Sequence, residues 1–147
     1  MYDMQEKVSI WFEVTLSYRK LQEDGTEKKV SEMVVVDANS FTEAEKRALQ
    51  EMGDIVRSGV EIKKINPAPY KSVFFDEADR EKWYRAKLSF ISYDEVAGKE
   101  KRTNSTYLVQ ADTFAQALRN VESVMRGCND YVTANICETR IMEVYTR

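Results

Sequence analysis

Histidine is absent from this sequence of 147 residues. Its absence removes the Ser–His–Asp and Cys–His catalytic arrangements, the histidine metal ligands and the commonest general base of enzymes. The sequence also lacks glycine-rich phosphate-binding loops and the Gly-x-Ser-x-Gly motif, so catalysis would depend on tyrosine, lysine, serine and carboxylate groups alone. We therefore predict that the protein is not an enzyme and has no catalytic residues, no cofactor and no bound metal.

The sequence also lacks long apolar runs and segregated charge. No segment approaches the length of about 18 apolar residues that a membrane-spanning helix requires. The 22 basic and 25 acidic residues give a net charge of −3 and are spread over both halves of the chain. The first seven residues show no pattern of a secretory or transit peptide. These features predict a cytoplasmic protein without a membrane partner, and they do not favour duplex DNA as a ligand.

Cysteine is scarce: the sequence contains two, Cys128 and Cys137. Their spacing fits no zinc-ligand pattern, because no Cys-x-x-Cys pair and no histidine accompanies them. We predict free reduced thiols, and a redox pair is the alternative.

An internal duplication is the clearest positive signal. Aligning Trp11 with Trp83, and then Gly25 with Gly98 after a one-residue insertion, brings two long segments into correspondence. The identical pairs are Trp11/Trp83, Leu16/Leu88, Ser17/Ser89, Glu23/Glu95, Gly25/Gly98, Glu27/Glu100, Lys28/Lys101, Val36/Val109, Ala38/Ala111, Phe41/Phe114, Ala44/Ala117 and Met52/Met125. We interpret the chain as a single globular unit made of repeat one (7–75), a linker (76–81) and repeat two (82–146).

Each repeat begins with a predicted β-hairpin, because alternating apolar residues lead to a polar turn at Gly25 or Gly98 and a β-branched return strand follows. A helix follows, because Ser40 with Glu43 and Thr113 with Gln116 fit the capping box. Two further extended segments complete each repeat. They are Val60 to Ile65 and Tyr70 to Phe75 in the first, and Tyr131 to Cys137 and Ile141 to Tyr145 in the second.

The predicted fold class is α+β. It consists of two tandem ββαβ(β) repeats, with antiparallel sheets that are each covered by one helix. The return strands are apolar on both faces, as at Val34 to Val36 and Tyr107 to Val109, so a second layer should cover the other face. We expect the two repeats to pack there as a pseudo-twofold pair, and a homodimer would serve the same purpose.

Trp11 and Trp83 lie on that second face at equivalent positions. Large aromatic side chains usually contribute through the area that they bury, so the first interpretation is that they fill the interface between the repeats. Exposed stacking platforms for bases or another flat ligand are an alternative. A hot spot for a protein partner is a third possibility.

Basic residues of the second hairpin form a candidate binding surface. Lys99, Lys101 and Arg102, with Arg85 and Lys87 on the facing strand, could form a cationic ribbon for phosphate groups. The competing interpretation is a solvated hairpin whose lysine and glutamate residues pair across the strands and discourage edge association. The acidic residues of linker 76–81 match no calcium-loop pattern, and we expect them to be solvated.

Several short motifs together resemble a known family. They are Trp-Phe-Glu at 11–13, Val36-Asp37-Ala38, Ser40 to Glu45, Trp83, Leu108 to Ala111, and Glu138 to Val144. The chain is similar over nearly its whole length to a family of small proteins of Bacteroides-group bacteria and their phages, catalogued as domain of unknown function 4494. The resemblance implies a bacterial or phage cytosolic protein, and it supplies no catalytic residues.

We therefore expect a non-enzymatic binding or adaptor protein that engages a protein partner. It could act as a homodimer, or as a bacterial or phage modulator of a host factor. The alternative is a protein that binds single-stranded nucleic acid or a nucleotide through Trp11, Trp83 and the basic residues Arg85, Lys87, Lys99, Lys101 and Arg102.

Overall fold

The computed structural model describes residues 4–53 and 59–146. Their order of elements is βββαββββαββ, an α+β fold made mostly of strands. The strands are β1 (Met4–Lys7), β2 (Trp11–Leu21), β3 (Glu27–Asp37), β4 (Val60–Pro67), β5 (Tyr70–Asp76), β6 (Lys82–Asp94), β7 (Lys99–Ala111), β8 (Tyr131–Glu138) and β9 (Ile141–Tyr145). The helices are α1 (Phe41–Gly53) and α2 (Phe114–Val124).

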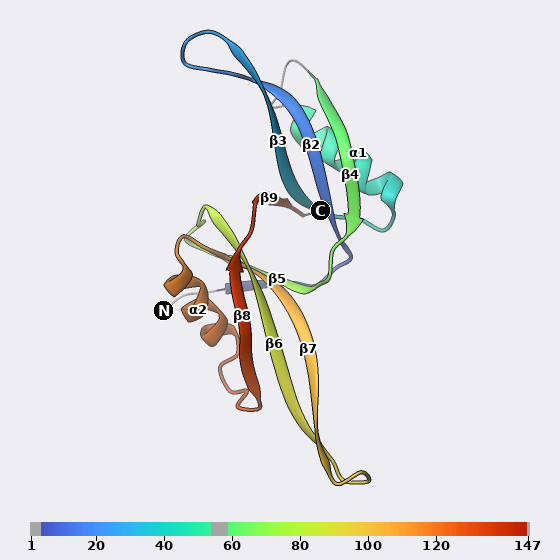
Figure 1. Ribbon diagram of the computed structural model, residues 1–147, viewed down its shortest axis with the longest axis vertical. Helices are drawn as coiled ribbons and strands as arrows, with labels where there is room; N and C mark the ends of the chain where they lie inside the picture. Colours follow the sequence, from blue (N-terminus) through green and yellow to red (C-terminus); the bar gives the residue numbers. More distant parts are fainter. Residues whose placement is uncertain (1–3, 54–58, 147) are drawn as a thin grey trace. The chain divides into compact units, whose positions relative to one another are not determined.

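The backbone divides into two compact units. Unit 1 comprises Met1–Val8 and Pro69–Thr139, and unit 2 comprises Ser9–Ala68 and Arg140–Arg147. The chain therefore passes from one unit to the other three times. Figure 1 shows β5, which follows β4 in the sequence, beside β7 of unit 1.

Unit 2 is a four-stranded sheet in the order β4-β2-β3-β9, with α1 over one face. Alternate residues of β2 and β3 face this helix because side chains alternate along a strand. The core includes Phe12, Val14 and Leu16 from β2 and Ala44 from the helix. Val60, Ile62 and Ile65 of β4 and Tyr145 of β9 pack against its margin.

Unit 1 is a five-stranded sheet in the order β1-β5-β7-β6-β8, with α2 over one face. Its core contains Phe74, Ala86, Leu88, Tyr107 and Val121. The central β6–β7 hairpin pairs without interruption from Lys82 and Ala111 to Asp94 and Lys99.

Both helices begin where the capping motifs predict. The Ser40 hydroxyl accepts a hydrogen bond from the Glu43 amide at 3.1 Å, and the Thr113 hydroxyl accepts one from the Gln116 amide at 3.1 Å. The side chains of Glu43 and Gln116 reach one residue further back than expected. They accept hydrogen bonds from the backbone amides that precede the capping residues.

The two sheets share their irregularities. The β2–β4 register shifts between Thr15 and Leu16, and the β6–β8 register shifts between Lys87 and Leu88. In each case the shift immediately precedes the leucine that the sequence alignment equates. β9 pairs with β3 in parallel, and β5 pairs with β7 in parallel, each with one further shift.

The last strand of each predicted repeat therefore lies in the sheet that contains the hairpin of the other predicted repeat. β5 belongs to residues 7–75 but pairs with β7, and β9 belongs to residues 82–146 but pairs with β3. The expectation of purely antiparallel sheets is wrong, because each of these strands joins its sheet in parallel. The compact units accordingly have boundaries that differ from those of the sequence repeats.

Candidate functional site

Both tryptophans are buried. Trp11 on β2 and Trp83 on β6 are each 1% exposed. The ring of Phe75 meets the Trp83 ring edge-on, with 5.2 Å between the ring centroids. A base can stack only on an exposed aromatic face, so the structure does not support the hypothesis that these residues are stacking platforms.

The five basic residues proposed as a ribbon do not share one surface. In the β6–β7 register, Arg85 is opposite Leu108, Lys87 is opposite Thr106 and Ile91 is opposite Arg102. Directly paired residues share a face, and faces alternate along each strand. Arg85, Lys87 and Arg102 therefore lie on one face, whereas Lys99 and Lys101 lie on the other.

Arg85 and Arg102 also have partners of their own. The Arg85 guanidinium donates a hydrogen bond to the Tyr70 hydroxyl at 3.4 Å and lies 6.0 Å from the centroid of its ring. Arg102 forms an ion pair with Glu100 at 3.7 Å. The structure thus favours the interpretation of a hairpin with paired charges over that of a continuous cationic ribbon.

The first hairpin carries a denser cationic arrangement, and its residues are not among the predicted binding residues. Arg19 is directly opposite Lys29, and Lys20 is directly opposite Lys28. Like charges in direct cross-strand pairs are destabilising. At the corresponding places in the second hairpin, Ile91 faces Arg102 and Ser92 faces Lys101, so each pair has one cation. Counting equal numbers of residues from Asp24 along both strands gives the two cationic pairs.

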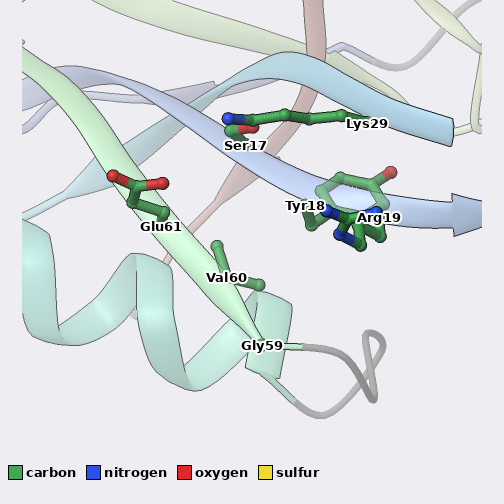
Figure 2. A pocket seen from close by; sticks show the side chains of 7 residues that line it. All are labelled: Ser17, Tyr18, Arg19, Lys29, Gly59, Val60 and Glu61. Carbon is green, nitrogen blue, oxygen red and sulfur yellow. The ribbon is translucent and has the colours of Figure 1, made fainter.

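An open groove of about 420 Å³ adjoins this hairpin in unit 2. Figure 2 shows the side chains of β2, β3 and β4 that surround it. Its lining consists of Ser17, Tyr18, Arg19, Lys29, Gly59, Val60 and Glu61. Glu61 forms an ion pair with Lys63 at 3.1 Å. The lining carries two cations, two hydroxyl groups and one carboxylate, and the open form of the groove resembles a contact surface more than an enclosed catalytic pocket.

Tyr18, which lines the groove, belongs to a polar cluster on the helix-facing side of the sheet. Burial raises the pKa of Tyr18 to about 12, and a hydrogen bond with Glu32 and the negative charge of Glu32 act in the same direction. The Oε2 atom of Glu32 is buried without a hydrogen-bond partner. In unit 1 the corresponding positions hold Phe90 and Ser105, so this titratable pair is specific to unit 2.

We predict that Tyr18→Phe makes the protein more resistant to alkaline unfolding. The raised pKa means that the folded state holds the phenol proton more tightly than the unfolded state, whose tyrosine pKa is near 10. The stability due to neutral Tyr18 is therefore complete below about pH 10 and is lost as the pH rises toward 12. Urea midpoints measured at several pH values should fall less steeply over this interval in the variant.

The matched control is Tyr93→Phe, since Tyr93 is exposed on the second hairpin. This control should keep the wild-type pH profile. An unchanged alkaline slope in Tyr18→Phe would contradict the assignment of Tyr18 as a group that loses its proton on unfolding.

The acidic linker differs from its expected solvated state at one residue. Asp76 is buried, and its carboxylate accepts hydrogen bonds from the Ala78 amide at 2.9 Å, the Asn120 side chain at 3.2 Å and the Arg80 guanidinium at 3.4 Å. Gln110 extends this network by accepting from the Asp76 amide and donating to the Arg80 carbonyl. The network connects the linker to β7 and α2, which is a structural role.

Residues 4–53 and 59–146 contain no group of three or more cysteine, aspartate or glutamate side chains placed to hold a metal ion. Within the same residues, no helix is long and apolar enough to cross a membrane. Cys128 is half-buried, Cys137 is exposed, and the two are not joined by a disulfide.

Comparison with known proteins identifies one match. A family model described as Domain of unknown function (DUF4494) covers residues 10–147. No curated protein and no solved structure matches the chain.

Proposed function

The chain belongs to the DUF4494 family, and from its structure we propose that it is a non-enzymatic binding protein that contacts a protein partner through the ends of its two long β-hairpins. The observation that carries this proposal is the projection of both hairpin ends beyond the strands that flank them.

The pairing registers define these hairpin ends. β2 and β3 pair as far as Leu21 and Glu27, whereas β4 stops pairing with β2 at Tyr18. β6 and β7 pair as far as Asp94 and Lys99, whereas β8 stops pairing with β6 at Phe90. We define the hairpin ends as residues 19–29 and 91–102. Figure 1 shows both extending past the neighbouring strands of their own sheets.

Exposed apolar side chains occupy both ends. Leu21 is 69% exposed on the first, and Tyr93 and Val96 are 67% and 100% exposed on the second. Charged residues of both signs surround them, as Lys20 and Asp24 do on the first hairpin. Apolar and aromatic groups within a polar rim are typical of protein contact sites.

A nucleic-acid or nucleotide ligand is the second candidate, and the paired cations of the first hairpin favour it. Arg19 and Lys20 face Lys29 and Lys28 across the two strands, so a phosphate group would relieve their repulsion. Acidic residues at the same end, among them Glu23, Asp24 and Glu27, reduce this attraction. The buried tryptophans add no stacking surface to it. Because the acidic residues and the buried tryptophans both weigh against a nucleic-acid ligand, a protein partner is the first proposal.

We further propose that the fold arose from two tandem ββαββ repeats that exchange their last strands. The shared strand order, the matching register shifts beside Leu16 and Leu88, and the parallel pairing of β5 and β9 support this proposal.

The binding proposal predicts the effect of removing the exposed side chains at the hairpin ends. Immobilised wild-type protein should retain a specific protein from an extract of its source cells, and the combined variant Leu21→Ser with Val96→Ser should bind it at least about tenfold more weakly, about 1.4 kcal/mol. The cause is the loss of apolar contact area while the buried core is left intact. Affinity for the purified partner, measured by calorimetry, gives the quantity.

The control is Leu49→Ser, which removes a partly exposed apolar side chain from α1 and leaves residues 19–29 and 91–102 unchanged. It should leave partner affinity unchanged. Equal binding by the hairpin variant and wild type would contradict the proposal. Nucleotide released on denaturation, or salt-sensitive binding of a single-stranded oligonucleotide that is lost in Arg19→Ala with Lys29→Ala, would support the second candidate instead.

A further inference from the structure

We propose that β8 is a dimerisation edge, at which the β8 strand of a second copy of this chain pairs antiparallel across a twofold axis. This inference is independent of the proposed function, because it concerns neither hairpin end. It rests on the pairing pattern of β8, on its composition and on a comparison with β4.

β8 is the outer strand of the unit 1 sheet, with β6 on its inner side. Two backbone hydrogen bonds determine which of its groups point outward: the Thr139 amide donates to Trp83 at 2.9 Å, and the Ile91 amide donates to Asp130 at 2.8 Å. Hydrogen-bonded and non-hydrogen-bonded pairs alternate along an antiparallel ladder. The outward-pointing amide and carbonyl groups are therefore those of Tyr131, Thr133, Ile136 and Glu138.

β8 lacks the residues that usually protect an edge strand. Natural edges carry lysine, other charges or proline, which disfavour pairing with another chain. From Tyr131 to Cys137 the strand has no charged residue and no proline, and Val132 is 44% exposed. Glu138 at its end forms an ion pair with Lys82 at 3.2 Å.

β4 occupies the same place in unit 2 and is protected. The registers with β2 and β6 equate Glu61 with Val132, Lys64 with Asn135 and Pro67 with Glu138. The residue skipped by the register shift is Lys63 in β4 and Ala134 in β8. The β4 edge therefore carries three charged residues and a proline at these four positions. The β8 edge carries a valine, an alanine, an asparagine and a glutamate, and the glutamate is already paired with Lys82.

The register shift within β8 identifies the partner strand. The two outward-pointing residues on either side of it, Thr133 and Ile136, are three positions apart, whereas a regular strand offers outward groups every two positions. A second β8 has the same irregularity. In an antiparallel twofold pair, Thr133 of one copy meets Ile136 of the other, and Tyr131 meets Glu138, so each outward-pointing group faces an outward-pointing group.

The charge pattern agrees with self-pairing at β8 and opposes it at β4. In the twofold β8 pair the central contact joins Ala134 to Asn135 of the other copy, and no like charges meet. The equivalent pairing of two β4 strands would place Lys63 opposite Lys64 and would put Pro67, which has no amide hydrogen, at an outward position. Pairing of β8 with a second β8 gives a twofold interface between identical surfaces, which is the commonest symmetry of homodimers.

The test introduces lysines into β8 at the positions that correspond to Lys63 and Lys64 of β4. Wild-type protein should have the mass of a dimer in sedimentation equilibrium, and Ala134→Lys with Asn135→Lys should have the mass of a monomer, because lysines of the two copies would then face each other. The control, Lys63→Ala with Lys64→Asn, should remain a dimer. A monomeric wild type, or a lysine variant that stays dimeric, would overturn the proposal.

A cross-link tests the register without depending on the lysine variant. In the twofold pair Val132 of one copy is opposite Cys137 of the other, at a non-hydrogen-bonded position whose spacing suits a disulfide. Val132→Cys in a Cys128→Ser background should form a covalent dimer when diamide oxidises the two thiols to a disulfide and is itself reduced. The same variant with Cys137→Ser should form none. Absence of the dimer, or its persistence without Cys137, would contradict this register.

Discussion

Replacing Trp83 with alanine should lower the free energy of unfolding by about 3–5 kcal/mol, the range for removal of a buried aromatic side chain. Trp83 is almost fully buried, and Phe75 packs edge-on against its ring. Truncation therefore removes apolar contact area and leaves a cavity whose walls cannot fully relax. Urea unfolding should show a lower midpoint with little change in slope.

The controls separate loss of packing from loss of any aromatic residue. Tyr93→Ala removes a largely exposed aromatic side chain and should change stability by less than about 0.5 kcal/mol. Trp83→Phe keeps an apolar ring, so its free energy of unfolding should fall between those of the alanine variant and the wild type. A Trp83→Ala protein as stable as wild type would show that the indole is not packed in the interior.

Replacing Asp76 with alanine should destabilise the protein by about 3 kcal/mol, because hydrogen bonds to a charged group contribute about 1.5–3 kcal/mol and the variant leaves a buried donor unpaired. The Asp76 carboxylate accepts hydrogen bonds from Asn120, from Arg80 and from the Ala78 amide. Without it, the Asn120 amide keeps only its bond to the Gln110 carbonyl, and the Arg80 guanidinium loses a buried acceptor. Calorimetric or urea unfolding gives the size of this effect.

A matched control uses another aspartate that accepts backbone hydrogen bonds. Asp94 accepts from the Val96 and Ala97 amides in an exposed turn, so Asp94→Ala should cost no more than about 1 kcal/mol. Asp76→Asn keeps an acceptor but loses the negative charge beside Arg80. Its loss of stability should fall between those of Asp76→Ala and Asp94→Ala. Equal stability of the Asp76 and Asp94 alanine variants would contradict the structural role of the network.

Local sequence signals predicted the local elements. The capping motifs at Ser40 and Thr113 mark the helix starts because they satisfy backbone amides within a few residues. The turn glycines Gly25 and Gly98 have positive φ values of 87° and 63°, which explains why glycine punctuates both hairpins. These features depend on short-range chemistry, so a single sequence contains them.

The partners of β5 and β9 could not be predicted in the same way. Alternation and β-branched content indicate that Tyr70 to Asp76 and Ile141 to Tyr145 are strands, but the same pattern fits any sheet that offers a free edge. The expectation that each stayed with its own repeat followed the order of the sequence. Pairing at long range depends on the competition between all available edges.

The candidate site was predictable in part. Residue parity alone would have placed Lys101 and Arg102 on opposite faces of their strand, because neighbouring residues point to opposite sides. The Tyr18–Glu32 pair could also have been singled out from the sequence, because the alignment of the two predicted repeats places Phe90 and Ser105 at the corresponding positions. Its raised tyrosine pKa, by contrast, depends on burial that becomes visible only in the folded chain.

The crossing of β9 into unit 2 has a consequence for synthesis of the chain. Unit 2 begins at Ser9, yet its sheet gains its last strand only when Ile141–Tyr145 has been made. Multidomain chains often complete their N-terminal domain while the ribosome is still adding later residues. Here the edge of β3 stays open until β9 has been made, so the sheet of unit 2 reaches its final strand order only after β8, the last strand of unit 1, has been synthesised.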